Sequence, residues 1–120
     1  FDTVSREGDF LGTAIAPGIA TAAEALFAKA SALPRIELVP PQHAIGTNTV
    51  TSMQSGIVFG YVGLVEGIVA RIHEELGEKA TVVATGGYAG LIAGETSVID
   101  KVNADLTLVG LRLIHEMNKS

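Results

Sequence analysis

The apolar positions in the first third of the chain predict a β-hairpin followed by a helix. Residues 1–16 place apolar side chains on both sides of the polar turn Glu7–Asp9, as in a hairpin. Pro17 and Gly18 end the second strand, and apolar residues at three- and four-residue steps then predict a helix over residues 19–31. Leu33 and Pro34 end this helix, because proline disfavours helical backbone in the residue before it.

The longest periodic segment follows the sequence Gly46–Thr49 and predicts a long helix. Its apolar residues form one helical face about seven turns long. These residues are Val50, Met53, Ile57, Tyr61, Leu64, Ile68, Ile72 and Leu76. Asn48 or Thr49 is the expected N-cap, because a short side-chain oxygen accepts a hydrogen bond from the first free N–H groups. Gly77 is the expected C-terminal cap.

Four glycines form a second stripe along the same predicted helix. They are Gly56, Gly60, Gly63 and Gly67. Each glycine in a helix interior costs roughly 1 kcal/mol relative to alanine. The stripe therefore indicates that something packs close to the backbone, and a neighbouring helix or a partner subunit is favoured over a ligand.

The rest of the chain predicts short strands that alternate with helices. Arg35–Val39 is an expected extended piece, and Lys79–Thr85 an expected buried strand. A short helix is expected over Tyr88–Ile92, and an edge strand over Ser97–Val102. This order of elements predicts an α/β fold, with helices packed on a sheet, in a single domain over residues 1–120.

The last predicted helix runs from Leu106 to about Asn118. Asp105 or Thr107 is expected to satisfy its N-terminus. Three apolar residues are expected to form its buried face. They are Leu108, Leu111 and Ile114.

Composition and charge exclude several classes of function. Hydrophobic residues make up 48% of the chain and aromatic residues 5%, so the core must be aliphatic. The formal net charge of −5 argues against a nucleic-acid surface and against an anionic membrane surface. The absence of cysteine excludes disulfides, thiolate metal sites and a cysteine nucleophile, and is compatible with a cytoplasmic location.

The sequence predicts neither a membrane span nor a signal peptide. The most membrane-like segment is Ser52–Ala70, which Glu66 interrupts and Arg71 closes. A span usually needs about 20 largely apolar residues, and an acidic residue at its centre is costly. The chain opens at Phe1 without an initiator methionine or a basic segment, and inside a predicted strand. This opening suggests a fragment or a processed product.

Two turns are candidate ligand sites. Gly86 and Gly87 follow a predicted strand, where glycine lets the backbone approach a flat or anionic ligand. A threonine in Gly46–Thr49 could donate a hydrogen bond to a substrate carbonyl or hydroxyl. A tight turn and a plain helix cap are the alternative interpretations.

The titratable residues form no catalytic or metal-ligating pattern. The three histidines, which lie far apart, have no ligand spacing. They are His43, His73 and His115. Asp2, Glu7 and Asp9 form an acidic edge at the first hairpin, where a solvated turn is the favoured interpretation. The sequence contains no Walker-type phosphate loop, no nucleophile elbow and no dinucleotide-binding glycine motif.

Five motifs, in order, resemble type III pantothenate kinases. They are Leu11–Gly18; Ala25–Phe27 with Leu33–Pro34; Ile45–Val50 with Gln54–Gly56; Ala84–Gly87; and Asp105–Leu111. The resemblance covers essentially all 120 residues. It implies a ribonuclease-H-like domain of the acetate kinase, sugar kinase, Hsp70 and actin superfamily, with helices on both faces of a mixed sheet.

The resemblance also implies a reaction, its cofactors and three site residues. The implied reaction transfers a phosphoryl group from ATP to the primary hydroxyl of pantothenate, the first step of coenzyme A biosynthesis. It implies a divalent metal such as Mg²⁺ and a monovalent cation, potassium or ammonium, in a cytoplasmic homodimer. Thr49 matches the family's pantothenate-contacting threonine. Gly86 and Gly87 match the glycine pair that lines the nucleotide side.

The same resemblance places the catalytic residues outside this chain. The family's Asp-x-Gly-Asn-Thr phosphate loop and its Gly-x-Asp-Arg motif with the catalytic base are not in the sequence. The Asp-Phe-Gly-Thr segment, which holds the cation, would lie just before Phe1. We therefore expect a C-terminal domain that needs its own N-terminal domain as a partner and is inactive alone. Three alternatives remain: an accessory factor in transcription regulation, a dimerisation module, and a kinase for another small substrate.

Overall fold

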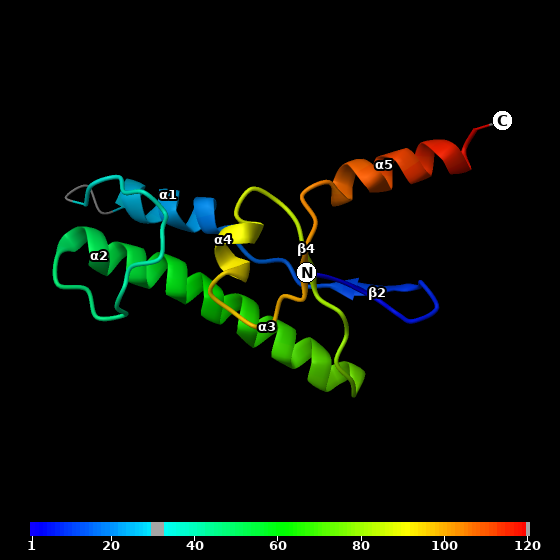
Figure 1. Cartoon of the computed structure of the whole chain (residues 1–120), viewed down its shortest axis with the longest axis horizontal. Helices are drawn as coiled ribbons and strands as arrows, with labels where there is room; N and C mark the ends of the chain where they lie inside the picture. The colour runs from blue at the N-terminus through cyan, green and yellow to red at the C-terminus, as the bar shows by residue number, and fades with distance from the viewer. Residues whose placement is uncertain (30–32, 120) are drawn as a thin grey trace. The chain divides into compact units, whose positions relative to one another are not determined.

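The computed structural model describes residues 1–29 and 33–119 (Figure 1). Helices and short strands alternate along the chain, which confirms the predicted α/β class. The chain forms two compact units, Phe1–Arg35 and Ile36–Ser120. Within these described residues, the strands make two separate pairs rather than one sheet.

The first unit begins with the predicted hairpin. Strand β1 (Asp2–Val4) pairs antiparallel with β2 (Phe10–Thr13). In the turn, the N–H of Ser5 donates to the carbonyl of Asp9 at 2.8 Å. Gly8 has φ 89°, a left-handed conformation that favours glycine. The predicted turn is therefore confirmed.

Helix α1 (Ile19–Lys29) completes the first unit. The last two residues of the predicted helix, 30 and 31, lie outside the described residues. The guanidinium of Arg35 donates to the carboxylate of Glu24 and lies 5.5 Å from the centroid of the Phe27 ring. The hydrogen bond and the charge of Glu24 raise the pKa of Arg35 above its usual value.

One continuous helix dominates the second unit. It consists of α2 (Thr49–Gln54), a π-helical turn η1 (Ser55–Phe59) and α3 (Gly60–Leu76). Asn48 is the N-cap, and Gly77 ends the helix in a left-handed conformation with φ 73°. Both predicted caps are confirmed, because each depends on side chains or backbone close in sequence.

The π-helical turn changes which residues of this helix are buried. Met53 and Ile57 are buried as predicted, but further along the buried residues are not the predicted Tyr61, Leu64 and Ile68. They are Val58, Val62, Val65 and Val69. A π turn contains one extra residue, so the face shifts by one position beyond it. The predicted face was therefore wrong over α3.

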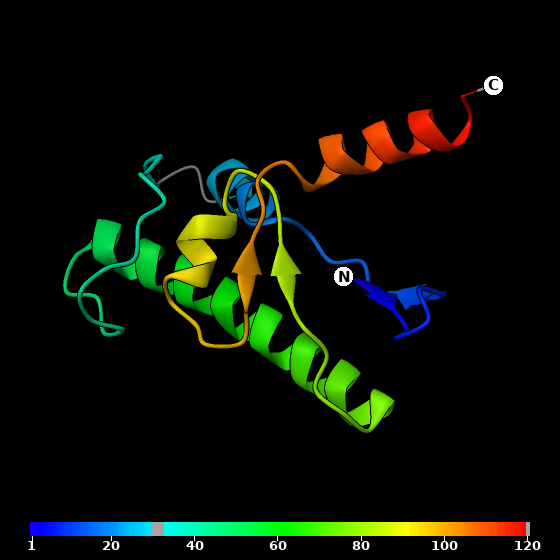
Figure 2. The same cartoon turned by 45° about the vertical axis from the view of Figure 1, so that its right-hand side comes forward.

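Two short parallel strands and a short helix pack beside the long helix (Figure 2). Strand β3 (Val83–Ala84) pairs with β4 (Lys101–Val102), and α4 (Ala89–Ala93) lies between them in sequence. Both strands are shorter than predicted. A side chain extends the pairing, because the carboxylate of Asp100 accepts a hydrogen bond from the N–H of Val82 at 2.7 Å. Residues 35–39 form no strand.

Helix α5 (Leu106–Met117) has the predicted extent but not the predicted cap or buried face. Asp105 occupies the N-cap position, yet its side chain makes no capping hydrogen bond. No residue of α5 is buried, and the expected core positions Leu108, Leu111 and Ile114 are more than half exposed.

The helix over Thr49–Leu76 is long and apolar enough to cross a membrane, judged by length and composition alone. That criterion is weak, because the core helix of a soluble protein also meets it. Near its middle, the carboxylate of Glu66 accepts a hydrogen bond from the hydroxyl of Thr96 at 3.0 Å. A row of valines along the helix is buried within the protein. These contacts attach one face of the helix to the rest of the second unit, and 22% of its most apolar 18-residue window is buried within the protein.

Candidate functional site

Thr49 lies in the first turn of the long helix, where a reciprocal set of hydrogen bonds fixes the backbone. The side-chain oxygen of Asn48 accepts from the N–H of Thr51 at 2.9 Å. In return, the hydroxyl of Thr51 accepts from the N–H of Asn48 at 3.4 Å. The N–H of Thr47 donates to the same hydroxyl at 3.3 Å. This capping box holds residues 47–51 in one conformation.

Gly46 allows the preceding loop to lie directly against the helix. A Cβ atom at position 46 would lie 2.5 Å from both Cα and Oγ of Ser52, and still closer to its backbone nitrogen. Real Cβ atoms essentially never come this close to backbone atoms. The close approach therefore requires glycine at this position.

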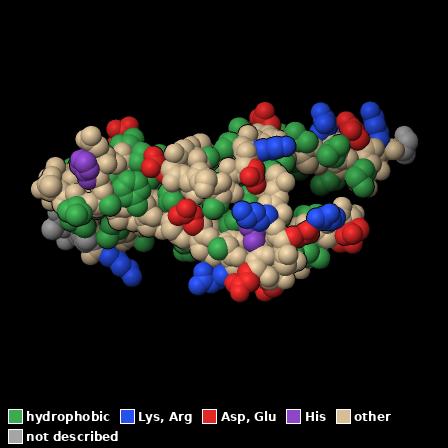
Figure 3. Space-filling view, turned by 60° about the horizontal axis from the view of Figure 1, so that its bottom comes forward, with side chains coloured by type: hydrophobic (Ala, Val, Ile, Leu, Met, Phe, Trp, Pro, Cys, Tyr) green, Lys and Arg blue, Asp and Glu red, His purple; other side chains and the backbone are tan. Residues whose placement is uncertain are grey.

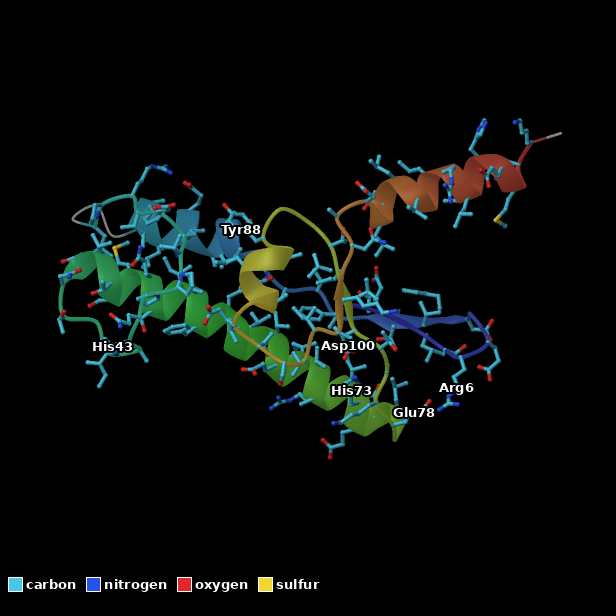
Figure 4. The ribbon with its side chains drawn as sticks, viewed as in Figure 1. Arg6, His43, His73, Glu78, Tyr88 and Asp100 are labelled. Atoms are coloured by element: carbon cyan, nitrogen blue, oxygen red, sulfur yellow. The ribbon has the colours of Figure 1, made fainter. Side chains whose placement is uncertain are left out.

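Two polar side chains of the helix hold the rest of that loop. Gln54 is the buried polar residue of the described chain, and its Nε2 donates to the carbonyl of Glu37 at 3.1 Å. The hydroxyl of Ser55 donates to the carbonyl of Ala44 at 2.5 Å. Together with the cap, these bonds attach residues 37–48 to the first two turns of the helix. Figure 4 shows His43 in this loop, beside the helix start.

The side chain of Thr49 itself is available to a ligand. Thr49 is exposed, and its hydroxyl makes no hydrogen bond to another described residue. The N-terminal end of a helix also carries partial positive charge, which favours a carbonyl, hydroxyl or anionic group nearby. Val50, the next residue of the helix, and Ile45 in the preceding loop are exposed as well.

The glycine pair lies at the carboxyl edge of the parallel strands. Gly86 has φ 105° and its carbonyl accepts from the N–H of Ala89 at 3.2 Å, so the turn into α4 requires glycine there. A Cβ at Gly87 would meet nothing within 4 Å, so packing within the described chain does not require this glycine. Asn103 follows β4 at the same edge, where its side chain accepts from the N–H of Asp105 at 3.0 Å.

Thr49 and the glycine pair lie in different parts of the second unit. In Figure 1, α4 lies beside the middle of the long helix and the turn before α4 lies on the side of α4 away from that helix, whereas Thr49 is the first residue of the helix. No neighbour lies within 4 Å of a Cβ built on Gly86 or Gly87. The structure therefore presents two candidate surfaces and does not bring them into contact.

The sequence pattern missed the two residues that attach the loop to the helix. Gln54 and Ser55 lie between the apolar residues Met53 and Ile57 of the long helix. The apolar periodicity places Gln54 on the buried side of the helix. A polar residue at such a position needs a hydrogen-bond partner, and this signal would have identified Gln54. Its partner, the carbonyl of Glu37, is 17 residues away and has no sequence signal.

The described residues form no evident cation site. Across residues 1–29 and 33–119, no three side chains of His, Asp or Glu come together as metal ligands. Figure 4 shows His43 and His73 near opposite ends of the long helix. The donors that a divalent cation prefers are therefore dispersed.

Comparisons with known proteins agree with one another. The sequence model of the type III pantothenate kinase family matches residues 1–71. A type III pantothenate kinase of Dehalococcoides mccartyi is 60% identical over 119 residues, which are 99% of this chain and 45% of that protein. Those of Moorella thermoacetica and an Anaeromyxobacter species are 57% and 58% identical, over 98% and 99% of the chain. The chain spans less than half the length of these curated relatives.

Proposed function

Because the chain belongs to the type III pantothenate kinase family, we propose that it is the C-terminal domain of a kinase that phosphorylates pantothenate with ATP. The reaction is the first step of coenzyme A biosynthesis and takes place in the cytoplasm. The catalytic base and the phosphate loop belong to an N-terminal domain, and this chain supplies one wall of the pantothenate site and part of the nucleotide cleft.

The exposed hydroxyl of Thr49 is the observation that carries this proposal. A helix start fixed by the capping box, by Gly46 and by the loop hydrogen bonds presents a hydroxyl in a defined position. Pantothenate offers an amide, hydroxyls and a carboxylate, all of which hydrogen-bond to a hydroxyl or to a helix N-terminus. Thr49 therefore suits a substrate-positioning role rather than a catalytic one.

Gly86 and Gly87 are the proposed nucleotide-binding residues. The left-handed conformation of Gly86 and the open space beside Gly87 suit a close approach of backbone and nucleotide. Mg²⁺ and a monovalent cation, potassium or ammonium, would be bound mainly by the N-terminal domain. Among the described residues of this chain, no three His, Asp or Glu side chains come together as ligands for a divalent cation.

The complete enzyme is proposed to be a homodimer whose ribonuclease-H-like domain contains one mixed sheet. Two-stranded sheets are marginal alone, so each pair, β1–β2 and β3–β4, is expected to be extended by further strands. A Cβ at Gly56, Gly60 or Gly63 would meet nothing within 4 Å, so the stripe is open to close packing by a second subunit. We expect neither nucleic acid nor a membrane as a partner, in line with the net charge of −5.

Replacing Thr49 tests the substrate site. In the full-length enzyme, Thr49→Ala should raise the KM for pantothenate about tenfold or more, because one hydrogen bond to substrate is lost. The KM for ATP should change little, and Thr49→Ser, which keeps the hydroxyl, should restore most of the affinity. Equal KM values for pantothenate in wild type and Thr49→Ala would refute the role of Thr49. An inactive wild-type protein would refute the kinase assignment itself.

A dimerisation module is the second candidate, favoured by the open glycine stripe. Gly60→Leu should weaken dimerisation, measured by analytical ultracentrifugation, while Thr49→Ala should leave it unchanged. A stable dimer of Gly60→Leu would show that the stripe is not part of the dimer interface.

The chain alone should have no pantothenate kinase activity. Measurable activity free of contaminating enzyme would contradict the division of roles between the two domains.

A further inference from the structure

Helix α5 exposes an apolar surface that no other described part of the chain covers. None of its residues is buried; Val109 is half-buried, and the other large apolar side chains range from 40% exposed at Leu106 to 82% at Met117. The others are Leu108, Leu111, Leu113 and Ile114. In Figure 1, α5 extends away from the long helix and from α4, and Figure 3 shows hydrophobic side chains on its surface among charged ones.

Local interactions alone do not account for a stable helix here. Isolated helices shorter than about 12–15 residues are marginal in water, and α5 has 12 residues. It lacks a side-chain N-cap bond. Its ion pair, Arg112–Glu116 at 3.7 Å, is exposed and has the less favourable order, with the basic residue first. At its C-terminal end, the side-chain amide of Asn118 donates to the carbonyl of Ile114 at 2.8 Å. These local bonds are few for an exposed 12-residue helix, so we expect packing against another surface to stabilise α5.

The apolar surface is too wide for a single partner helix. At 3.6 residues per turn, Leu106, Val109, Leu113 and Met117 form one stripe along α5. Ile114 and Leu111 form a second stripe beside it, and the two stripes together cover about 200° of the circumference; Leu108 lies about 60° beyond Leu111. A two-helix seam covers a narrower stripe than this. The width fits a helix that lies in a groove of a folded domain.

We propose that the apolar surface of α5 is the docking site for the part of the polypeptide outside residues 1–120. This inference rests on the proposed function, in which the chain is one domain of a longer kinase. The curated relatives are more than twice as long as the matched segment, so a second domain is available as occupant. Two copies of α5 packed together would cover one stripe of each helix and leave the other in water.

Hydrogen–deuterium exchange on the full-length protein tests the docking. Amides of residues 106–117 should exchange about tenfold or more slowly than in an unfolded peptide of the same sequence. Leu113→Glu should remove this protection and also speed exchange in a segment outside residues 1–120. The control Arg112→Glu, on the polar side of α5, should retain the protection. Unprotected amides in the wild type would overturn the proposal.

Photo-crosslinking keeps the proposal testable if Leu113→Glu fails to fold. A photoreactive phenylalanine analogue at position 111, which is 58% exposed here, should crosslink to a segment of the same polypeptide outside residues 1–120. A crosslink to a second copy, or none, would refute the docking. Neither readout depends on catalysis, so an inactive protein with a docked α5 would refute only the kinase assignment.

Discussion

The sharpest test of the loop architecture is the substitution Gly46→Ala. The added methyl group would lie 2.5 Å from Cα and Oγ of Ser52, both fixed in the first turn of the long helix. To make room for the methyl group, the helix backbone at Ser52 would have to move by about 1 Å, and this movement would break hydrogen bonds of the helix. The loop must move instead, and the bond from the N–H of Thr47 to the hydroxyl of Thr51 would be strained or lost.

The expected cost follows from these two effects. Forcing an extra methyl group into a packed site costs typically about 1–3 kcal/mol, and a lost hydrogen bond about 1 kcal/mol. Gly46→Ala should therefore lower the free energy of unfolding by about 2–4 kcal/mol. In urea unfolding followed by circular dichroism, the midpoint should fall by about 1 M or more, given a typical slope of about 1–3 kcal/mol per M.

Gly60→Ala is the matched control. Position 60 lies inside the long helix, and its added methyl group would meet nothing within 4 Å. In the chain alone, with no second subunit packed on the glycine stripe, this substitution should raise the free energy of unfolding by up to about 1 kcal/mol through helix propensity. If Gly46→Ala proved as stable as the wild type, the close approach of the loop to Ser52 would be refuted. A destabilised Gly60→Ala would mean that the glycine stripe is already covered.

Two further predictions concern the second unit. Val58→Ala should lower the free energy of unfolding by about 2–3 kcal/mol, because Val58 is fully buried. Val50→Ala should lower it much less, because Val50 is 43% exposed. Equal midpoints of the two variants in urea would contradict the burial of Val58. In Asp100→Ala the N–H of Val82 loses its acceptor, which should lower the free energy of unfolding by about 1 kcal/mol. The melting temperature should then fall by several degrees. Asp100→Asn keeps an acceptor and should retain most of the stability, so equal losses in both variants would argue against this bond.

The candidate site was predictable from sequence only in part. Thr49 and the glycine pair were identified from motifs, and the structure places Thr49 in the first helical turn and Gly86 in a left-handed turn. Their roles in binding remain predictions. The attachment of residues 37–48 through Gln54 and Ser55 was not predicted, because the acceptors are backbone carbonyls, which every residue has.

The sequence by itself determined the local features of this protein. The hairpin turn at Gly8, the cap at Asn48 and the helix end at Gly77 depend on residues within a few positions of each other. Side-chain oxygens and glycine favour these conformations without help from distant parts of the chain. The ordered family motifs likewise required only the sequence.

The tertiary structure alone decided which surfaces are buried. The π turn at Ser55–Phe59 moved the buried face of α3 by one position, and periodicity does not reveal where one residue is inserted. Helix α5 has an apolar pattern that predicted burial, yet it is exposed, because a pattern shows which side of a helix is apolar and not what covers it. Burial depends on contacts between segments far apart in sequence, and only the folded chain specifies those contacts.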